Sequence, residues 1–356
     1  MSGDSSRNGG GGSGVPPHVD GGVPIIDLEG FDPRTRNERR NEVVDAVATA
    51  CRDWGFFQVV GHGVPDELID RVWDETRSFF ALPRASKLAI ARSAENPRGY
   101  YDRELTKNVR DLKEVFDFGY VPRPDLPEDH PSNRAPVDGF NQWPPDAPGL
   151  RPTMLVYFGH CEDLGQRIFS AFCLGLGLPA NYLQRYFRPH TSFVRLNHYP
   201  LDDPLEAGEA ADVTEPGDLA LGHHTDSGAL TILLQDDVGG LQVHADDEWI
   251  DVPPVDGAFV INIGDMTQVW SNDRYRAAVH RVRPMKTAAR YSIPFFYNPS
   301  YATDCAPLPT PEGAPPRYRP INWGEFRRAR TAGDYADYGK EIQIEDFRLD
   351  PARSEG

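Results

Sequence analysis

Short β-type segments separated by turn-forming residues make up much of the chain after residue 190. Gly, Pro, Asn and Asp cluster between these segments, as in Asp237 to Gly240 and in Pro253 to Gly257. Several short strands at this spacing favour an antiparallel sandwich or jelly roll. The predicted strands are Phe193 to Tyr199, Ala229 to Leu234, Leu241 to His244, Phe259 to Ile263, Arg276 to Val282 and Arg290 to Phe296.

The first half of the chain is dominated by helical periodicity and has fewer predicted strands. Strands are predicted at Val23 to Leu28 and Phe56 to Val60, and helices over Asn37 to Trp54, from Pro65 onward, and over Thr153 to Leu176. We therefore expect an α+β fold with a mixed, mostly helical region (23–150) and a jelly-roll core (151–356) that includes a C-terminal helix over Trp323 to Tyr338. The two form one compact unit (23–350), and the Gly/Ser-rich residues 1–22 predict a disordered tail.

The charge of the chain limits its partners. It has 37 Lys and Arg against 54 Asp and Glu, a formal net charge of −17, so nucleic acid and anionic membrane surfaces are unfavourable partners. The charge is localised, because residues 196–273 contain 17 acids and no Lys or Arg. There is no basic-then-apolar leader and no apolar run near ~18 residues. We therefore expect a cytoplasmic protein, monomeric or weakly homo-oligomeric, that acts on a small molecule.

The four cysteines are scattered along the chain without the paired spacing of a zinc site or a disulfide framework. They are Cys51, Cys161, Cys173 and Cys305. We expect them to be reduced and mostly buried.

The pattern His-x-Asp occurs three times, and only one copy has a context suited to metal binding. His18-Val19-Asp20 lies in the predicted tail, and His244-Ala245-Asp246 runs into an acidic turn. His224-Thr225-Asp226 instead opens the predicted strand Ala229 to Leu234. Because side chains alternate along a strand, His224 and Asp226 are expected on one face.

A third ligand is expected from the predicted strand Arg276 to Val282. His280 shares a strand face there with Ala278 and Val282, which by itself is typical of a core histidine. Its pairing with His224 and Asp226 favours a metal site, since two imidazoles and one carboxylate leave three positions of an octahedral ion open. That arrangement is used by non-haem Fe(II) oxygenases for a co-substrate and O₂.

An anion site is predicted next to the metal. Arg290 and Ser292 share one strand face, and a buried arginine is costly unless an anion pairs with it. Its planar fork matches a carboxylate, and the hydroxyl adds a further donor. Asn197 and Tyr199 share parity on their own strand and offer an amide and a phenol to the same pocket.

These residues lie in segments that resemble the Fe(II)/2-oxoglutarate-dependent dioxygenases of the isopenicillin N synthase-like family. The resemblance implies a double-stranded β-helix (jelly roll) with flanking helices, Fe(II) at His224, Asp226 and His280, and 2-oxoglutarate at Arg290 and Ser292 with help from Tyr199 and Asn197. It also implies C–H oxidation with O₂ and release of succinate and CO₂. The segments are VPIIDL (23–28), WGFFQVVGHGVP (54–65), KEVFDFG (113–119), RLNHYP (195–200), HHTDSGALTILLQD (223–236), GGLQV (239–243), NIGDM (262–266), HRV (280–282) and RYSIPFFYNP (290–299).

Two alternatives stay open at this point. Some members of the family, isopenicillin N synthase among them, use iron and O₂ without 2-oxoglutarate and share the Arg-x-Ser pattern, although the pair Asn197 and Tyr199 resembles the 2-oxoglutarate users. The second alternative is a cupin-like metal-binding protein without oxygenase activity.

The substrate is the least constrained part of the prediction. An aromatic, largely neutral pocket would suit a small natural product, which would be hydroxylated, desaturated or cyclised. The acidic stretch Leu201 to Asp218 is expected to form a loop near the mouth of the site. Candidate substrate contacts are Tyr100, Tyr101, Phe116, Phe118, Phe296 and Asn298.

Overall fold

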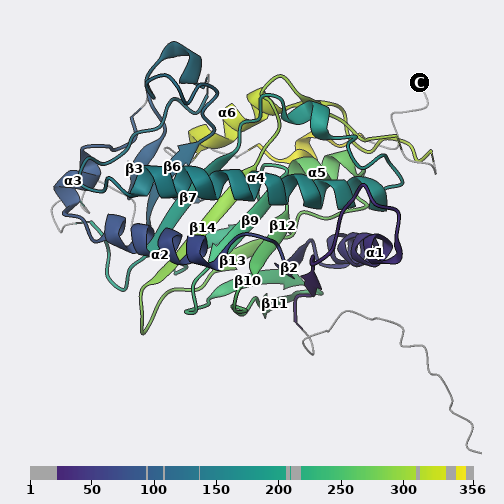
Figure 1. The fold of residues 1–356 in the computed structure, drawn as a ribbon, viewed down its shortest axis with the longest axis horizontal. Helices are drawn as coiled ribbons and strands as arrows, with labels where there is room; N and C mark the ends of the chain where they lie inside the picture. Colours follow the sequence, from purple (N-terminus) through teal and green to yellow (C-terminus); the bar gives the residue numbers. More distant parts are fainter. Residues whose placement is uncertain are drawn as a thin grey trace, which may run out of the picture.

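Two β-sheets face each other, and a layer of helices covers the outer face of the larger sheet (Figure 1). The structure is a computed structural model that describes residues 22–93, 95–106, 109–135, 137–205, 209, 218–309, 313–333 and 342–349. Within these residues the larger sheet has eight strands in the order β1-β2-β12-β9-β14-β7-β6-β3, and the smaller has four in the order β11-β10-β13-β8.

The strands of the larger sheet come from both halves of the chain. They are β1 (Ile25–Asp27), β2 (Phe56–Val60), β3 (Gly99–Tyr101), β6 (Glu114–Gly119), β7 (Phe193–Tyr199), β9 (Leu230–Gln235), β12 (Phe259–Ile263) and β14 (Arg290–Tyr297). The smaller sheet contains β8 (Leu221–His224), β10 (Leu241–Ala245), β11 (Glu248–Asp251) and β13 (His280–Val282). Two short hairpins, β4 (Leu105–Thr106) with β5 (Val109–Arg110) and β15 (Asp304–Cys305) with β16 (Ile321–Asn322), complete the described strands.

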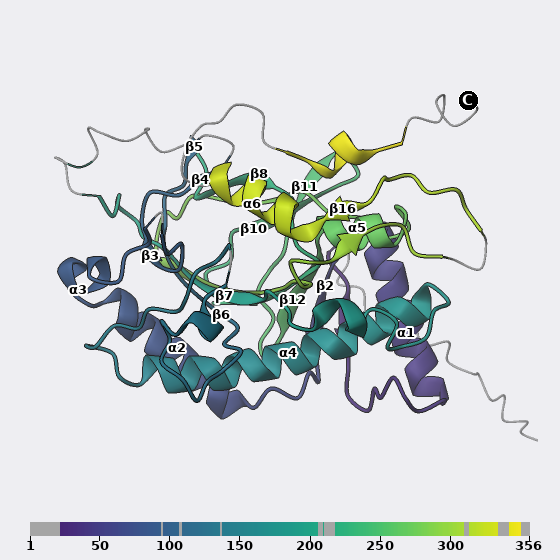
Figure 2. The same ribbon diagram turned by 90° about the horizontal axis from the view of Figure 1, so that it is seen from above.

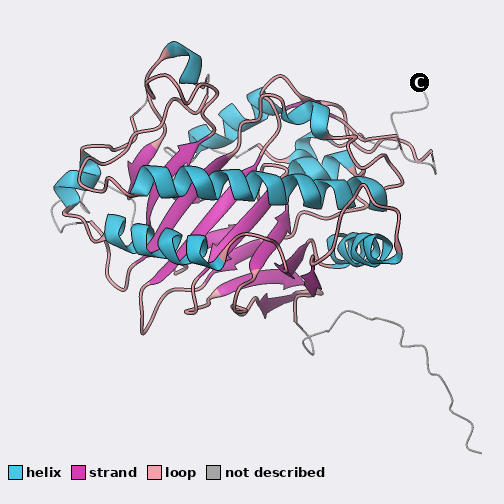
Figure 3. Cartoon of the chain, in the orientation of Figure 1, coloured by secondary structure: helices cyan, strands magenta, loops and turns pink. Residues whose placement is uncertain are grey.

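The helices lie mainly on one side of the larger sheet. Helices α1 (Glu38–Asp53), α2 (Asp66–Phe80) and α4 (Leu150–Gly175) cover its outer face, while α6 (Trp323–Gly333) lies on the opposite side with the smaller sheet (Figures 2 and 3). The short helix α3 (Arg84–Leu88) follows α2 and precedes β3, and the short helix α5 (Asp265–Trp270) lies between β12 and β13. One core cluster fills the space between helices and sheet, and a second lies between the two sheets.

Most predicted elements are confirmed to within a few residues. Helix α1 begins after the cap Asn37, whose side chain accepts a hydrogen bond from the Arg40 N–H at 2.8 Å. The jelly-roll class is also confirmed, since the two sheets enclose a common core.

The structure departs from the predicted elements in places. Besides its helices, the first half contributes β3 and β6, which extend the main sheet beyond β7. The strand predicted from Arg276 begins only at His280, and β8 was not predicted at all. Most of the predicted tail and most of the acidic stretch 201–218 lie outside the described residues.

The four cysteines are free and buried, as predicted. Burial raises the pKa of the thiols of Cys51, Cys161, Cys173 and Cys305. In the part of the chain that the structure describes, no helix has the length and apolarity needed to cross a membrane.

The packing of α4 against the sheet predicts a contrast between two positions on that helix. Met154 is 0% exposed, whereas Val156 is 52% exposed. Met154→Ala should lower the free energy of unfolding by about 2–5 kcal/mol, because it leaves a cavity in the core. Val156→Ala should change it by no more than about 0.5 kcal/mol. Urea unfolding followed by circular dichroism measures both, and equal losses would contradict this packing.

Candidate metal and anion site

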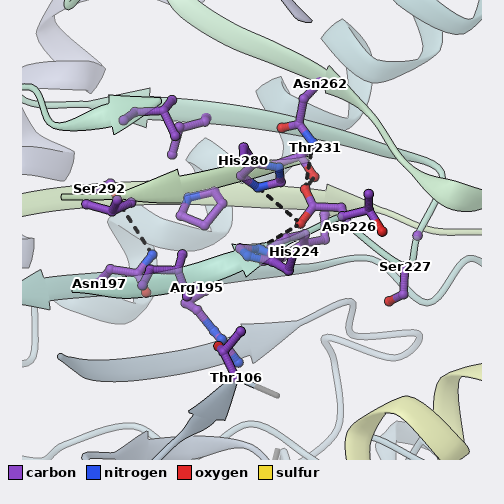
Figure 4. A pocket seen from close by; sticks show the side chains of 18 of the residues that line it. Thr106, Arg195, Asn197, His224, Asp226, Ser227, Thr231, Asn262, His280 and Ser292 are labelled. Atoms are coloured by element: carbon purple, nitrogen blue, oxygen red, sulfur yellow. Dashed lines mark hydrogen bonds and ion pairs between the residues drawn. The ribbon is translucent and has the colours of Figure 1, made fainter. Parts of the chain in front are cut away.

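A cavity between the two sheets holds most of the polar residues that the sequence singled out (Figure 4). Strands β7, β9, β12 and β14 form its wall on the larger sheet, and β8, β10 and β13 form the facing wall. The β4–β5 hairpin and helix α6 also contribute residues. Segments far apart in the sequence therefore meet around one space.

Three potential metal ligands meet in this cavity. Nε2 of His224 and Nε2 of His280 lie 3.6 and 3.7 Å from the same Asp226 oxygen, Oδ1 (Figure 4). The candidate ligand atoms of the three residues all lie within 4.8 Å of one another, so one cation could contact all three. The donor set of two imidazoles and a carboxylate fits Fe(II) with open positions for other ligands.

Strand pairing and a tight connection bring the three residues together. Strands β8 and β13 are antiparallel, and His224 lies directly opposite His280. Strand β8 ends at His224, so Asp226 lies in the connection to β9 rather than in a strand with His224. The prediction that strand alternation aligns His224 with Asp226 is therefore wrong in its reason, although the two residues do converge.

The connection that carries Asp226 is held by the segment before α5. The Asp265 N–H donates to the Asp226 carbonyl oxygen at 2.8 Å. A Cβ at Gly264 would lie 2.3 Å from the Gly228 carbonyl oxygen and 3.1 Å from that of Asp226. Only glycine lets the two backbones approach this closely.

Neighbouring groups orient each ligand. The Nδ1 atoms of His224 and His280 lie 2.8 and 3.1 Å from the carbonyl oxygens of Gly222 and Ala278. Nδ1–H donors there leave both Nε2 atoms as lone-pair ligands. The Asp226 Oδ2 accepts from Thr231 Oγ1 and, at 2.7 Å, from Asn262 Nδ2, which turns Oδ1 toward the imidazoles.

The electrostatics of the cluster favour the protonation states that a metal needs. Burial acts to raise the pKa of Asp226, but His280, His224 and the Asn262 amide outweigh burial and lower it. Burial, with the neighbouring His224, lowers the pKa of His280 to about 4. At neutral pH the cluster therefore offers an ionised carboxylate and a neutral His280.

Arg290 and Ser292 line the same cavity from β14. The register with β7 places Arg290 opposite Tyr199 and Ser292 opposite Asn197. Asn197 Nδ2 donates to Ser292 Oγ at 3.3 Å, and the Arg290 Cζ lies 5.1 Å from the centre of the Tyr199 ring. The sequence-predicted group of four is thus brought together by one pair of strands.

The Arg290 guanidinium is buried, and some of its N–H donors have no hydrogen-bond partner. Arg290 is 1% exposed, and its Nη2 donates to Gln235 Oε1 at 3.4 Å, while Nε and Nη1 have no hydrogen-bond partner. A desolvated cation with unsatisfied donors is costly unless an anion completes it. A dicarboxylate such as 2-oxoglutarate therefore fits this end of the cavity.

The predicted substrate contacts divide into two groups. Phe296 and Asn298 line the cavity, and Phe296 stacks on Phe193 with ring centres 4.6 Å apart. The other four, Tyr100, Tyr101, Phe116 and Phe118, do not line it.

Their placement follows from β6 being a buried strand of the main sheet. Phe116 and Phe118 are 0% exposed and belong to the core between sheet and helices, where both contact Trp143. The Tyr100 hydroxyl donates to Glu114 Oε2 at 2.7 Å. Phe116, Phe118 and Tyr100 are therefore structural, which corrects the expectation that they face a substrate, and Tyr101 does not line the cavity.

The cavity also carries charged residues that the sequence analysis did not identify. They are Glu104, Lys113, Arg195, Arg327 and Arg330, so the expected neutral, aromatic pocket is wrong. Arg195 has the same parity on β7 as Asn197 and Tyr199, so strand alternation could have identified it. In Figure 4 its side chain extends toward Thr106 of the β4–β5 hairpin. The positions of that hairpin and of α6 depend on tertiary packing and have no local signal.

A jelly roll with two histidines, a carboxylate and a buried arginine in one cavity defines a class of non-haem metal-dependent oxygenases. Two family models match the chain: the N-terminal domain described as non-haem dioxygenase in morphine synthesis over residues 23–146, and the 2OG-Fe(II) oxygenase superfamily over residues 183–299. The chain belongs to the 2OG-Fe(II) oxygenase superfamily, whose characteristic reactants are Fe(II), 2-oxoglutarate and O₂. It is an oxidoreductase of the dioxygenase type.

Individual relatives resemble the chain over most of its length. The 2-oxoglutarate-Fe(II) type oxidoreductase hxnY of Emericella nidulans is 34% identical, with 90% of this chain and 93% of the relative covered. Among solved structures, a full-length Neurospora crassa protein in complex with alpha-KG has a TM-score of 0.72 at 29% identity, covering 89% of this chain and 98% of that one. JOX2 in complex with 2OG, Fe and JA has a TM-score of 0.72 at 30% identity, covering 92% and 90%.

The hydrogen bonds to Asp226 predict that Thr231 strengthens metal binding. Thr231→Val keeps the shape of the side chain but removes the hydroxyl that donates to Oδ2. Affinity for Co(II), followed by its visible spectrum, should fall about 10- to 100-fold.

Thr76→Val is the matched control. Thr76 is also buried, but its hydroxyl donates within α2 to the Val72 carbonyl oxygen at 2.7 Å. The Thr76→Val variant should bind Co(II) with the affinity of the wild type. Equal affinities for both variants would show that Thr231 does not orient the ligand.

Proposed function

We propose that the chain catalyses Fe(II)- and 2-oxoglutarate-dependent oxidation of a C–H bond in a small molecule, with His224, Asp226 and His280 as the iron ligands. In the hydroxylation form, one atom of O₂ enters the substrate and the other enters succinate, while 2-oxoglutarate loses CO₂. Desaturation or ring closure at the same carbon are the other outcomes. Bound Fe(II) would supply the site at which 2-oxoglutarate and O₂ react.

The residues of the chain have separate tasks in this reaction. The imidazoles and the Asp226 carboxylate hold the metal on one side and leave the cavity side open. Arg290 and Ser292 bind the distal carboxylate of 2-oxoglutarate, and Tyr199 and Asn197 keep these two side chains in place. The surrounding apolar residues Leu233, Leu241 and Val282 exclude water from this end of the cavity.

The buried Arg290 is the observation that carries the proposal. A cupin-like protein that only stores or binds a metal has no need of a desolvated guanidinium with two unsatisfied nitrogens in the same cavity. An iron oxidase that works without 2-oxoglutarate would also leave these donors without an anion unless its own substrate supplied one. The family membership supports the same choice.

The test is spectroscopic. Under anaerobic conditions, Fe(II) and 2-oxoglutarate added together should produce a visible charge-transfer band that neither produces alone, since the band arises when the keto acid chelates the metal. A band that needs no 2-oxoglutarate, or the absence of any band, would contradict the proposal. Substrate candidates can then be ranked by the succinate they release.

Arg290→Gln should raise the 2-oxoglutarate concentration needed for half of the band at least tenfold. The substitution removes a charge-assisted contact of about 1.5–3 kcal/mol, which corresponds to about 10- to 150-fold in affinity. The saturated band itself should keep its wavelength, because the metal ligands are unchanged.

Arg283→Gln serves as the control for loss of an arginine. Arg283 pairs with Asp251 at 3.4 Å on the surface, where its side chain is 51% exposed. The Arg283→Gln variant should need the same 2-oxoglutarate concentration as the wild type for half of the band. If Arg290→Gln also titrated like the wild type, the 2-oxoglutarate assignment would be wrong.

A further inference from the structure

An uncharged side chain of the cavity is buried without a hydrogen-bond partner for its oxygen. Asn298 follows β14 directly and lines the cavity. It is 2% exposed, and among the described residues nothing donates a hydrogen bond to its Oδ1. A buried polar group that is left unpaired costs about 1–3 kcal/mol. A ligand that pairs with the Asn298 carboxamide would recover this cost.

The Asn298 carboxamide lies against the turn that carries Asp226. A Cβ on Gly228 would lie 1.9 Å from Asn298 Oδ1, so the amide rests directly on this glycine. The neighbouring Ser227 also lines the cavity, and its hydroxyl makes no hydrogen bond within the described part of the chain. Asn298 and Ser227, here called the Asn298 corner, therefore offer uncharged hydrogen-bonding groups close to the metal ligands.

The Asn298 corner and the 2-oxoglutarate site lie on opposite sides of the metal ligands. Asn298 comes eight residues after Arg290, which spans about 26 Å in an extended chain. In Figure 4 the cluster of His224, Asp226 and His280 lies between Ser292 and Ser227. A 2-oxoglutarate molecule held between Arg290 and the metal does not reach the corner. The corner is thus left for the primary substrate.

The backbone of Asn298 is fixed although its side chain is unpaired. Its N–H donates to Ser192 Oγ at 3.0 Å, and its carbonyl oxygen accepts from the Thr191 N–H at 3.3 Å. Trp323 Nε1 of α6 in turn donates to Thr191 Oγ1 at 2.8 Å. The carboxamide is therefore presented from a rigid position, which lowers the entropy cost of binding a ligand.

The charged residues on this side of the cavity already have partners within the protein. Arg327 Nη2 contacts Asp138 Oδ1 at 3.3 Å. Arg330 donates to two backbone carbonyl oxygens at 3.3 and 3.4 Å, and Glu104 contacts Lys113 Nζ at 2.8 Å. A charged substrate group would need a counter-charge of its own here, because burying an unpaired charge is costly. An uncharged group that matches Asn298 avoids this cost.

Resting on the proposed function, we propose that the primary substrate carries an uncharged amide, a carboxamide or a lactam, that binds Asn298. An amide side chain offers an acceptor and donors in one plane, so it can form two parallel hydrogen bonds with a second planar amide. The Ser227 hydroxyl adds a further donor or acceptor. Phe296 stacks on Phe193 in the same cavity, with ring centres 4.6 Å apart. The apolar body of the substrate contacts this aromatic surface.

Matched small molecules test this assignment. Isothermal titration calorimetry with protein loaded with Zn(II) and 2-oxoglutarate would compare 3-phenylpropanamide, N,N-dimethyl-3-phenylpropanamide and 3-phenylpropanoate. The primary amide should bind at least tenfold more tightly than the other two. The dimethyl compound has no N–H for Asn298 Oδ1, and the acid brings a charge without a counter-charge. Equal binding of all three, no binding of any, or tightest binding of the acid would overturn the proposal.

Asn298→Leu locates the receptor. This variant keeps much of the side-chain volume but removes the amide. Its affinity for 3-phenylpropanamide should fall at least tenfold and its affinity for the dimethyl compound should stay within about twofold. Asn181→Leu is the matched control, because Asn181 is exposed and does not line the cavity. An unchanged preference for the primary amide in Asn298→Leu would overturn the proposal.

Asn298→Asp gives a readout that a merely structural role would not move. The carboxylate keeps an acceptor, loses the donors and adds a negative charge. This variant should therefore bind the cation 3-phenylpropan-1-amine more tightly than 3-phenylpropanamide, which reverses the order of the wild type. The same order as in the wild type would contradict contact between Asn298 and the amide. Should Asn298→Leu fail to fold, this reversal decides the proposal.

The Fe(II)–2-oxoglutarate band separates the two proposals. If the wild type gives no band, the proposed function fails, whatever the amides do. If the band forms but the preference for the primary amide is absent, only the amide assignment fails. A variant that keeps the wild-type band has an intact metal site, so its change in amide binding reports on the Asn298 corner.

Discussion

The antiparallel pairing of β13 with β8 is the contact on which the candidate site depends. It sets His280 opposite His224, and the turn after β8 brings Asp226 between them. The larger sheet then supports this turn through Thr231 on β9 and Asn262 on β12. The candidate metal ligands are thus held by two sheets at once, and their geometry requires that both sheets be formed.

Buried charge is the second constraint. Asp226, Arg290 and the network around Glu104 are all removed from water, and each is satisfied differently. Glu104 has three cationic partners within the protein. Asp226 has hydrogen-bond donors on one oxygen and two imidazoles on the other. Arg290 keeps two nitrogens without a partner, so an incoming anion would complete it. A buried charge whose partners are all within the protein, such as Glu104, stabilises the fold, whereas a buried charge with unsatisfied donors, such as Arg290, is available to bind a ligand.

The sequence predicts which residues come together in the cavity better than it predicts which strands and turns carry them. Runs such as Phe259–Ile263 and Asn37 to Trp54 carry strong local patterns, and both elements form as expected. Strand alternation correctly pairs Arg290 with Ser292 and Asn197 with Tyr199. It fails for Asp226, because a turn and not a strand carries this residue, and β8 itself is short and polar.

The residues that line the substrate side of the cavity could not be predicted from local sequence patterns. Phe116 and Phe118 were expected there as part of an aromatic pocket, yet β6 turns them toward the helices. Arg327 and Arg330 reach the cavity because a C-terminal helix packs beside β8, a contact between segments about a hundred residues apart. Local periodicity contains no information about such a contact, so the charged character of the cavity emerges only from the fold.

If the metal and Arg290 hold opposite ends of one 2-oxoglutarate molecule, the two binding events must be coupled. Isothermal titration calorimetry of 2-oxoglutarate, with and without saturating Mn(II), measures this coupling directly. Binding should be at least about tenfold tighter with the metal, and by thermodynamic linkage Mn(II) should bind more tightly by the same factor in the presence of 2-oxoglutarate. Equal affinity for 2-oxoglutarate with and without Mn(II) would contradict a shared site.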